Sequence, residues 1–220
     1  IAEEHAIAMS SGIAKNGGKP VFNVYSTFLQ RTYDQLVQDL CVNNNSAVII
    51  NHYASVYGMN DVTHLGFFDI PMLTSIPNLV YLAPTNNEEL LAMTEYAVHQ
   101  HEHPVAIRVP VGEFTTTGVA DTTDYSILNK SEVTRRGEGI ALLGLGNFYH
   151  LANQVADELA KEGINATVVN PKFASGLDEE LLEELKANHS VVFTLEDGVV
   201  EGGWGQRVAS FYGPSNMRVK

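Results

Sequence analysis

The chain has 220 residues and is 45% hydrophobic, which is typical of a globular protein with one large or two modest domains. Its formal net charge of −13 argues against a nucleic-acid or anionic-membrane surface, and no apolar run approaches the roughly 20 residues of a membrane span. The single cysteine, Cys41, rules out an intrachain disulfide framework and favours a reducing, cytoplasmic compartment.

Short apolar runs alternate with helical patterns along the first half of the chain. The spacing of apolar residues predicts helices over 4–15, 28–41 and 86–99. Apolar runs bounded by turn residues predict strands at 20–25, 47–50, 79–82 and 105–109. Residues 52–65 form a polar stretch without periodicity and are predicted to be an irregular loop. Strands that alternate with helices are typical of a parallel α/β layer.

Residues 113–130 break this rhythm, because they are polar and lack periodicity, and they are predicted to be a linker. A second α/β pattern follows, with strands expected at 140–143, 166–169 and 191–195 and helices at 147–162, at 179–187 and up to Phe211. The predicted fold class is therefore α/β with two domains, residues 1–112 and 131–220. Each domain is expected to hold a mainly parallel sheet flanked by helices.

Two motifs near the start of the chain indicate a cofactor site. The first, Ile1-Ala2-Glu3-Glu4-His5-Ala6, places a carboxylate at a helix start. The second, Tyr25-Ser26-Thr27-Phe28-Leu29-Gln30-Arg31-Thr32-Tyr33-Asp34-Gln35, places an aromatic ring and an arginine at a strand end. A flat heteroaromatic cofactor needs one acid for a ring nitrogen and one face for stacking. Taken alone, Glu3 also fits a favourable acid at a helix N-terminus, and Phe28 fits plain core packing.

Together the motifs resemble those of the thiamine-diphosphate enzymes of the transketolase group, and within it 1-deoxy-D-xylulose-5-phosphate synthase, where they read much like IAEQHA and YSTFLQRAYDQ. Residues 1 to about 112 resemble the pyrimidine-binding domain, and about 130 to 220 resemble most of the C-terminal domain. The family's upstream domain, which holds the cofactor diphosphate and Mg2+, has no counterpart here. The resemblance therefore implies thiamine diphosphate and assigns this chain no metal ligand. Because the chain opens mid-motif without Met, it is expected to be a fragment that is inactive alone.

The resemblance gives Glu3 the central role. Thiamine chemistry requires a proton to leave C2 of the thiazolium, and the cofactor's own 4′-amino group removes it as the imino tautomer. A carboxyl group bonded to N1′ of the aminopyrimidine favours that tautomer. Such an acid must hold or share a proton in a dry site, so burial is expected to raise the pKa of Glu3.

Three residues of the second motif are implied to surround the cofactor and the substrate. Phe28 is expected to lie against the aminopyrimidine ring, a contact worth roughly 0.5–1.5 kcal/mol beyond area burial. Tyr25 is expected beside the cofactor, facing the substrate channel. Arg31 can hold a carboxylate or phosphate through two parallel hydrogen bonds. The alternative for Arg31 is an ion pair with Asp34 or Asp39 on a solvated face.

His64 lies in a Thr-His-x-Gly pattern that matches the family's active-site histidine, and Thr63, Gly66 and Asp69 match as well. An imidazole there can move protons or bind the donor's carboxylate or carbonyl oxygen. The alternative for a lone loop histidine is a solvent-exposed residue. A second group of histidines, the alternating run from His99 to His103, is read as a surface turn rather than a metal site.

The sequence departs from the family pattern on the acceptor side. The family's Asp-Arg-Ala-Gly is His52-Tyr53-Ala54-Ser55, and its Tyr-Pro-Arg-Gly is Val109-Pro110-Val111-Gly112. Tyr53 and Val111 thus replace two phosphate-binding arginines, and Asn60 replaces an acid; Tyr53 and Asn60 are kept as substrate-facing candidates. Charge-assisted bonds of this kind are worth roughly 1.5–3 kcal/mol each, so losing two weakens phosphate binding on the order of a thousandfold. The acceptor is therefore expected to be an aldehyde other than glyceraldehyde 3-phosphate.

The resemblance implies a transferase that joins decarboxylated pyruvate to an aldehyde acceptor and works as a homodimer. Two alternatives within the superfamily are a transketolase C-terminal subunit and the β-subunit of a 2-oxoacid dehydrogenase, which also place a glutamate before a helix. A third alternative, from another class, is a non-catalytic α/β assembly module, which predicts no thiamine binding even in the full-length chain.

Overall fold

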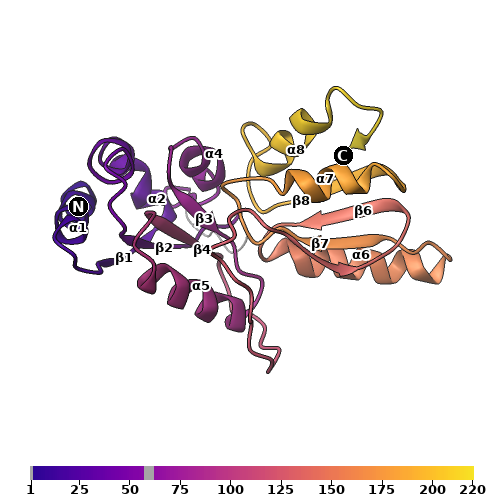
Figure 1. Ribbon diagram of the computed structural model, residues 1–220, viewed down its shortest axis with the longest axis horizontal. Helices are drawn as coiled ribbons and strands as arrows, with labels where there is room; N and C mark the ends of the chain where they lie inside the picture. The colour runs from indigo at the N-terminus through magenta and orange to yellow at the C-terminus, as the bar shows by residue number, and fades with distance from the viewer. Residues whose placement is uncertain (1, 57–61) are drawn as a thin grey trace.

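Two separate sheets organise the chain in the computed structural model, which describes residues 2–56 and 62–220 (Figure 1). The first sheet is entirely parallel and has the strand order β1-β2-β4-β3. Its strands are β1 (Val21–Tyr25), β2 (Val48–His52), β3 (Val80–Leu82) and β4 (Val105–Val109). β3 and β4 are buried along their whole length, as expected for a parallel sheet covered on both faces.

Helices cover both faces of the first sheet. In Figure 1, α5 (Asn87–His99) lies on one face, and α1 (Glu3–Lys15), α2 (Ser26–Leu29) and α4 (Asp69–Thr74) lie on the other. The single helix predicted over 28–41 is instead an interrupted helical segment. It runs through α2, a 3-10 turn η1 (Gln30–Thr32), α3 (Tyr33–Gln35) and a π-helical turn η2 (Leu36–Cys41). The wider π turn points Leu36, Leu40 and Cys41 all into the core.

The second sheet has the order β5-β7-β6-β8-β9. Its strands are β5 (Glu132–Arg135), β6 (Gly139–Gly144), β7 (Thr167–Asn170), β8 (His189–Leu195) and β9 (Arg218–Val219). Only the pairing of β5 with β7 is antiparallel among the strands described. Figure 1 shows α6 (Phe148–Lys161) on one face and α7 (Glu179–Leu185) and α8 (Trp204–Tyr212) on the other. The predicted fold class, with two mainly parallel sheets flanked by helices, is confirmed.

Along the sequence, residues 113–130 separate the strands of the first sheet from those of the second. The structure has no helix or extended strand in this segment. The domain boundaries themselves stay a prediction. The halves nevertheless share one apolar cluster, which includes Ile7 and Leu40 from the first half and Leu143 and Val208 from the second. None of the helices in the described ranges has the length and apolar character needed to cross a bilayer.

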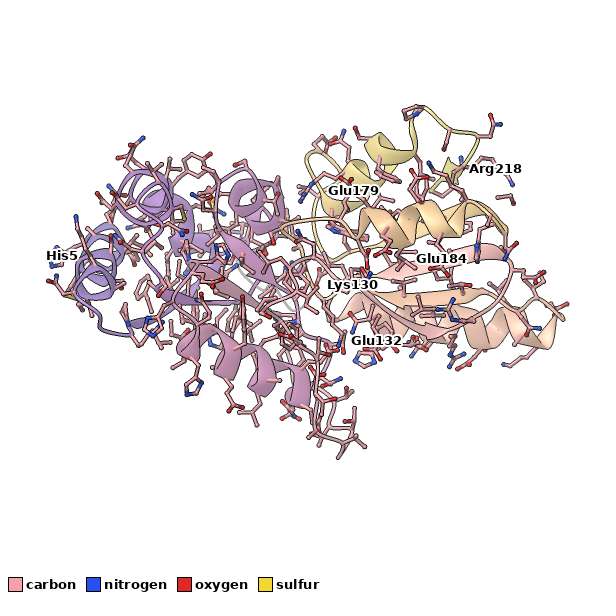
Figure 2. The ribbon with its side chains drawn as sticks, viewed as in Figure 1. His5, Lys130, Glu132, Glu179, Glu184 and Arg218 are labelled. Atoms are coloured by element: carbon pink, nitrogen blue, oxygen red, sulfur yellow. The ribbon has the colours of Figure 1, made fainter. Side chains whose placement is uncertain are left out.

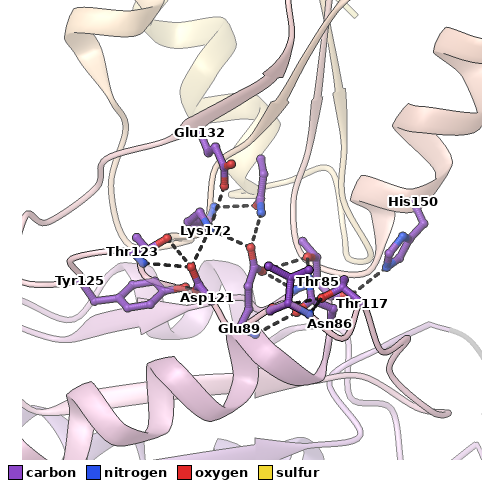
Figure 3. Close-up of polar contacts among 12 residues, drawn as sticks. Thr85, Asn86, Glu89, Thr117, Asp121, Thr123, Tyr125, Glu132, His150 and Lys172 are labelled. Atoms are coloured by element: carbon purple, nitrogen blue, oxygen red, sulfur yellow. Dashed lines mark hydrogen bonds and ion pairs between the residues drawn. The ribbon is translucent and has the colours of Figure 1, made fainter.

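A buried lysine joins the two halves near the linker (Figure 3). Lys172 follows β7, has 3% of its side chain exposed, and places its Nζ 2.8 Å from Oε1 of Glu89 on α5 and 3.0 Å from Oε2 of Glu132 on β5. Asp121 of the linker is 4.0 Å away. Figure 2 places Glu132 and Lys130 where the two halves meet. Three segments of the chain thus converge on one ammonium group.

Candidate active site

The candidate site is built at the carboxyl edge of the first sheet. Tyr25 is the last residue of β1, and it pairs in register with His52, the last residue of β2. Tyr53 therefore follows directly beside Tyr25, and α2 begins at the next residue after Tyr25. Because ligands of open α/β sheets bind outside the carboxyl ends of the strands, this edge is where a ligand is expected.

Four rings form a continuous cluster at this edge. The Tyr25 and Phe28 rings are nearly parallel, with centroids 6.1 Å apart, and the Tyr25 and Tyr53 centroids are 4.6 Å apart. The His64 ring meets the Phe28 ring edge-on at 5.3 Å. Tyr25 and Tyr53 remain 43% and 44% exposed. The edge therefore presents aromatic surface to whatever binds there.

An acid and a cation flank this cluster. Glu3, in the first turn of α1, lies with its Oε2 3.5 Å from Nη1 of Arg31, and the Arg31 guanidinium lies 5.8 Å from the centre of the Phe28 ring. Only 13% of the Glu3 side chain is exposed, compared with 46% for Arg31. Arg31 therefore lies between the acid and the ring and contacts both, and it pairs with Glu3 rather than with Asp34 or Asp39.

Opposing effects act on the pKa of the Glu3 carboxyl group. Burial raises the pKa, as expected, whereas the backbone hydrogen bond of Glu3 and the charge of Arg31 lower it. The pKa of Glu3 beside a bound ring stays a prediction.

The segment that carries His64 is fastened to the helical segment after β1. Ser26 Oγ donates to the Gly66 carbonyl at 2.9 Å, and Gln30 Nε2 donates to the Leu65 carbonyl at 3.3 Å. The hydroxyl of Thr63 lies 2.9 Å from Nδ1 of His64, which orients the imidazole. His64 is thus half-buried against Phe28 rather than fully exposed to solvent.

A close backbone approach sets the position of Tyr53. A Cβ atom added to Gly66 would lie 1.7 Å from the Tyr53 carbonyl oxygen, so only glycine fits there. Tyr53 itself adopts φ +56°, a left-handed conformation that is uncommon for a bulky residue. Strained backbone of this kind concentrates at functional sites.

The structure brings together all the sequence-predicted site residues that it describes; these are Glu3, Tyr25, Phe28, Arg31, Tyr53 and His64. Asn60 lies outside the described residues. His5, two residues after Glu3 in the sequence, is exposed at the outer end of the first half (Figure 2). The roles of these residues stay predictions.

Sequence reasoning missed a buried polar network beneath the loop. Arg108 of β4, which is 2% exposed, donates from Nε to Oδ2 of Asp69 at 2.7 Å and from Nη2 to Oδ1 at 3.3 Å. Tyr81 donates to Asp69 and accepts from Asn51 at 2.8 Å. Burial alone lowers the pKa of Arg108, but the charge of Asp69 outweighs it and the pKa is raised. A charged residue inside an apolar strand was the available signal for this network.

The residues present fit one end of thiamine diphosphate. The Glu3 carboxylate can accept from a protonated ring nitrogen, and the half-buried Phe28 ring, on the other side of Arg31, provides a stacking surface. Within residues 2–56 and 62–220 no group of three or more His, Cys, Asp or Glu side chains is arranged to hold a metal ion. The described part of the chain thus fits the aminopyrimidine end of the cofactor and offers no metal site for its diphosphate.

Fold and site together define an α/β protein with two mainly parallel sheets and an aromatic cluster at the carboxyl ends of the first sheet's strands. Two domain families match the sequence: the transketolase pyrimidine-binding domain over residues 1–116 and the transketolase C-terminal domain over residues 129–217. The chain belongs to the transketolase family.

Relatives named 1-deoxy-D-xylulose-5-phosphate synthase match nearly the whole chain. The protein from Natranaerobius thermophilus is 39% identical over 208 residues, 94% of this chain and 33% of the relative. The one from Lachnoclostridium phytofermentans is 40% identical over 211 residues, 96% of this chain and 33% of the relative. The one from Rippkaea orientalis is 37% identical over 220 residues, all of this chain and 35% of the relative. The chain therefore spans about a third of the length of these relatives.

A solved structure shares the fold. It is described as a split gene transketolase in an inactive beta4 tetramer, and it superposes with a TM-score of 0.84 at 23% identity, covering all of this chain and 71% of that one. At this identity the likeness supports the two-sheet architecture alone.

Proposed function

We propose that this chain is the pyrimidine-binding and C-terminal part of a thiamine-diphosphate-dependent transferase of the 1-deoxy-D-xylulose-5-phosphate synthase type. Such an enzyme joins the two-carbon unit of decarboxylated pyruvate to an aldehyde. The observation that carries the proposal is the unbroken series of contacts from Glu3 through Arg31 and Phe28 to His64 at the sheet edge. The names of the relatives support the reaction type.

The proposal gives each residue of the cluster a defined task. When bound, thiamine diphosphate supplies an acidic ring carbon that adds to the carbonyl group of the donor. Glu3 binds the aminopyrimidine nitrogen and shares a proton with it, and Phe28 holds the ring in place. A bound ring covers Glu3 further, and burial is the factor that raises its pKa. Arg31 and His64 bind the donor's carboxylate and carbonyl oxygen, with the imidazole oriented by Thr63.

The acceptor side favours an aldehyde without a phosphate group. Residues 52–66 contain no lysine or arginine, and Arg31 already has Glu3 as a partner. Tyr53 instead contributes a 44% exposed aromatic ring at the position where the family has an arginine. A phosphate dianion bound here would lack the charge-assisted bonds that recognise it.

Product analysis with pyruvate and matched aldehydes tests the acceptor assignment. The complete enzyme is expected to show a higher kcat/KM with unphosphorylated aldehydes than with glyceraldehyde 3-phosphate. A strong preference for the phosphorylated acceptor would contradict the assignment while leaving the reaction type in place.

The cofactor and assembly assignments are part of the same proposal. Mg2+ and the cofactor diphosphate are assigned to a domain outside this chain, and the working unit is assigned as a cytoplasmic homodimer. Calorimetric titration of the complete enzyme with thiamine diphosphate and Mg2+ is expected to show saturable binding, whereas a non-catalytic assembly module would bind none. The 220 residues alone are expected to be inactive, and turnover by them would contradict that expectation.

A further inference from the structure

A buried aspartate of the second half touches the loop that carries the candidate site. Asp197 follows β8, and its side chain is 1% exposed. Its Oδ2 accepts from Ser55 Oγ at 2.5 Å and from Asn147 Nδ2 at 2.8 Å, and its Oδ1 accepts from the backbone N–H of Val56 at 2.7 Å. Ser55 comes two residues after Tyr53. One carboxylate thus binds the exit of the Tyr53 segment to the second sheet.

The same residue reaches the His64 side of the loop by a second route. The Asp197 carbonyl accepts a hydrogen bond from Nη2 of Arg108, whose Nε donates to Asp69 at 2.7 Å. Asp69 begins α4 and lies five residues after His64. Asp69 and Arg108 are 0% and 2% exposed, so this route runs through groups that are shielded from water. Hydrogen bonds to buried charged groups are among the strongest that proteins make.

We propose that Asp197 is a positioning residue of the active site, through which the C-terminal domain fixes the Tyr53 and His64 segments relative to each other. The inference rests on the proposed function for its kinetic consequence. The hydrogen bonds of Asp197 toward the site go to Ser55, Val56 and Arg108, so it acts through these residues.

The contact chemistry defines an informative variant. In Asp197→Asn the side chain keeps its shape but has one acceptor oxygen instead of two. If the amide oxygen faces Val56, the new NH2 group meets Ser55 Oγ and the Asn147 side chain, which must turn to accept from it. If the amide oxygen faces Asn147, the NH2 group opposes the Val56 N–H. Either orientation loses the charge-assisted hydrogen bonds of the carboxylate and so weakens the anchor of the loop.

Asp178→Asn provides the matched control. Asp178 is also a buried aspartate of the second half, 9% exposed, and its carboxylate accepts from the backbone N–H groups of Leu181 and Ser131. It caps α7 and contacts no residue of the 53–69 region in the described structure. Its loss is therefore expected to lower stability without moving the site.

The test compares the two variants in the complete enzyme by hydrogen exchange and by kinetics. For Asp197→Asn we expect the backbone amide of Val56 to exchange at least tenfold faster and the aldehyde kcat/KM to fall roughly tenfold to a hundredfold. Cofactor affinity is expected to stay within about twofold of the parent enzyme. The rate of pyruvate decarboxylation without acceptor is expected to fall by less than the aldehyde kcat/KM, because Asp197 binds the Tyr53 segment directly and the His64 segment only through Arg108. Ser55→Ala, which removes one of the three donors, is expected to shift both readouts in the same direction by less.

Two outcomes would overturn the inference. One is unchanged exchange at Val56 with an unchanged aldehyde kcat/KM in Asp197→Asn. The other is a fall of all kinetic parameters in proportion to the unfolded fraction, as in Asp178→Asn, which would mean a structural role alone. If the parent enzyme shows no carboligation, the proposed function fails, and hydrogen exchange at Val56 still decides whether Asp197 positions the loop.

Discussion

At the scale of single residues, the candidate site depends on one point where two backbone segments touch. The carbonyl of Tyr53, held at φ +56°, lies against Gly66, and Ser26 binds the carbonyl of that glycine. A residue with any side chain at position 66 would push the segments that carry Tyr53 and His64 apart. The geometry of both rings is thus set by a residue that itself contributes no chemistry.

Gly66→Ala tests this contact. The added methyl group would collide with the Tyr53 carbonyl, so the free energy of unfolding in urea is expected to fall by about 1–3 kcal/mol, the usual cost of overpacking. Gly12→Ala is the control, because it lies inside α1 with nothing within 4 Å of an added Cβ. The control is expected to raise stability by roughly 0.5–1 kcal/mol. Equal effects of the two changes would contradict the account.

Cys41, the chain's one cysteine, provides a second test at this scale. It is fully buried, and burial raises the pKa of its thiol to about 12. Because the thiolate is the reactive form, iodoacetamide at pH 8 is expected to leave the folded protein unmodified and to label it in urea. Mass spectrometry reads out both states. Rapid labelling of the folded protein at pH 8 would show that the π turn does not bury the thiol.

At the scale of helices and strands, the sequence predicted the regular elements well and the irregular ones poorly. Strand β4 matches its predicted range, because an apolar run before a proline is a clear strand signal. Helix α4 and strand β5 were not predicted. The former is short and contains Pro71, and the latter alternates exposed and half-buried residues without a strongly apolar face. Both depend on tertiary contacts that a local pattern does not contain.

The same limit applies to the site. The motifs predicted that Glu3, Phe28 and His64 lie in one cluster, because each residue belongs to a local sequence pattern that resembles the family. The Asp69–Arg108 pair and the anchoring by Asp197 were missed, because they join residues 39 and 89 positions apart in the chain. Only the packed structure reveals such contacts.

Lys172, which joins the two halves, provides a prediction at the scale of helices and strands. Removing the ammonium group in Lys172→Met leaves Glu89, which is 5% exposed, without its charged partner, so stability is expected to fall by about 3–5 kcal/mol. Lys161→Met is the control, because its pair with Glu158 is exposed and is worth roughly 0–1 kcal/mol. Denaturant titration measures both variants. A loss below about 1 kcal/mol for Lys172→Met would contradict the account.

The pH dependence of the Lys172–Glu89 contact follows from the direction in which the pKa of Lys172 is shifted. Burial alone lowers the pKa of Lys172, but the charge of Glu89 and the neighbouring carboxylates outweigh burial and raise it. A lysine with a raised pKa in the folded state stabilises the fold below its ordinary pKa and stops doing so as the pH rises through the folded value. The difference between parent and Lys172→Met is therefore expected to be constant across neutral pH.

At the scale of the whole molecule, the two sheets behave as one unit in the structure. One apolar cluster extends from α1 to α8, and backbone hydrogen bonds of 2.8 Å join Ala83 to Lys172 and Ala174 to Tyr81 across the junction. The Asp197 contacts add a second junction at the site. The second half thus contacts the segment that carries Tyr53 through Ser55 and Val56.

Calorimetry tests whether the halves unfold together. A single transition is expected, with calorimetric and van't Hoff enthalpies that agree, because the two halves share buried apolar contacts and hydrogen bonds. Two separable transitions would show that the domains are independent and would weaken the case for a C-terminal domain that positions the loop.

The central claim is that the carboxyl group of Glu3 activates a thiamine ring held at the sheet edge. The rate of deuterium exchange at C2 of the cofactor, bound to the complete enzyme, tests this activation most directly. Glu3→Gln is expected to slow the exchange at least about a hundredfold, the usual range for loss of a proton-transfer partner. Glu4→Gln, next to it on α1, is expected to leave the exchange unchanged. Exchange at the parent rate in Glu3→Gln, with cofactor still bound, would contradict the account.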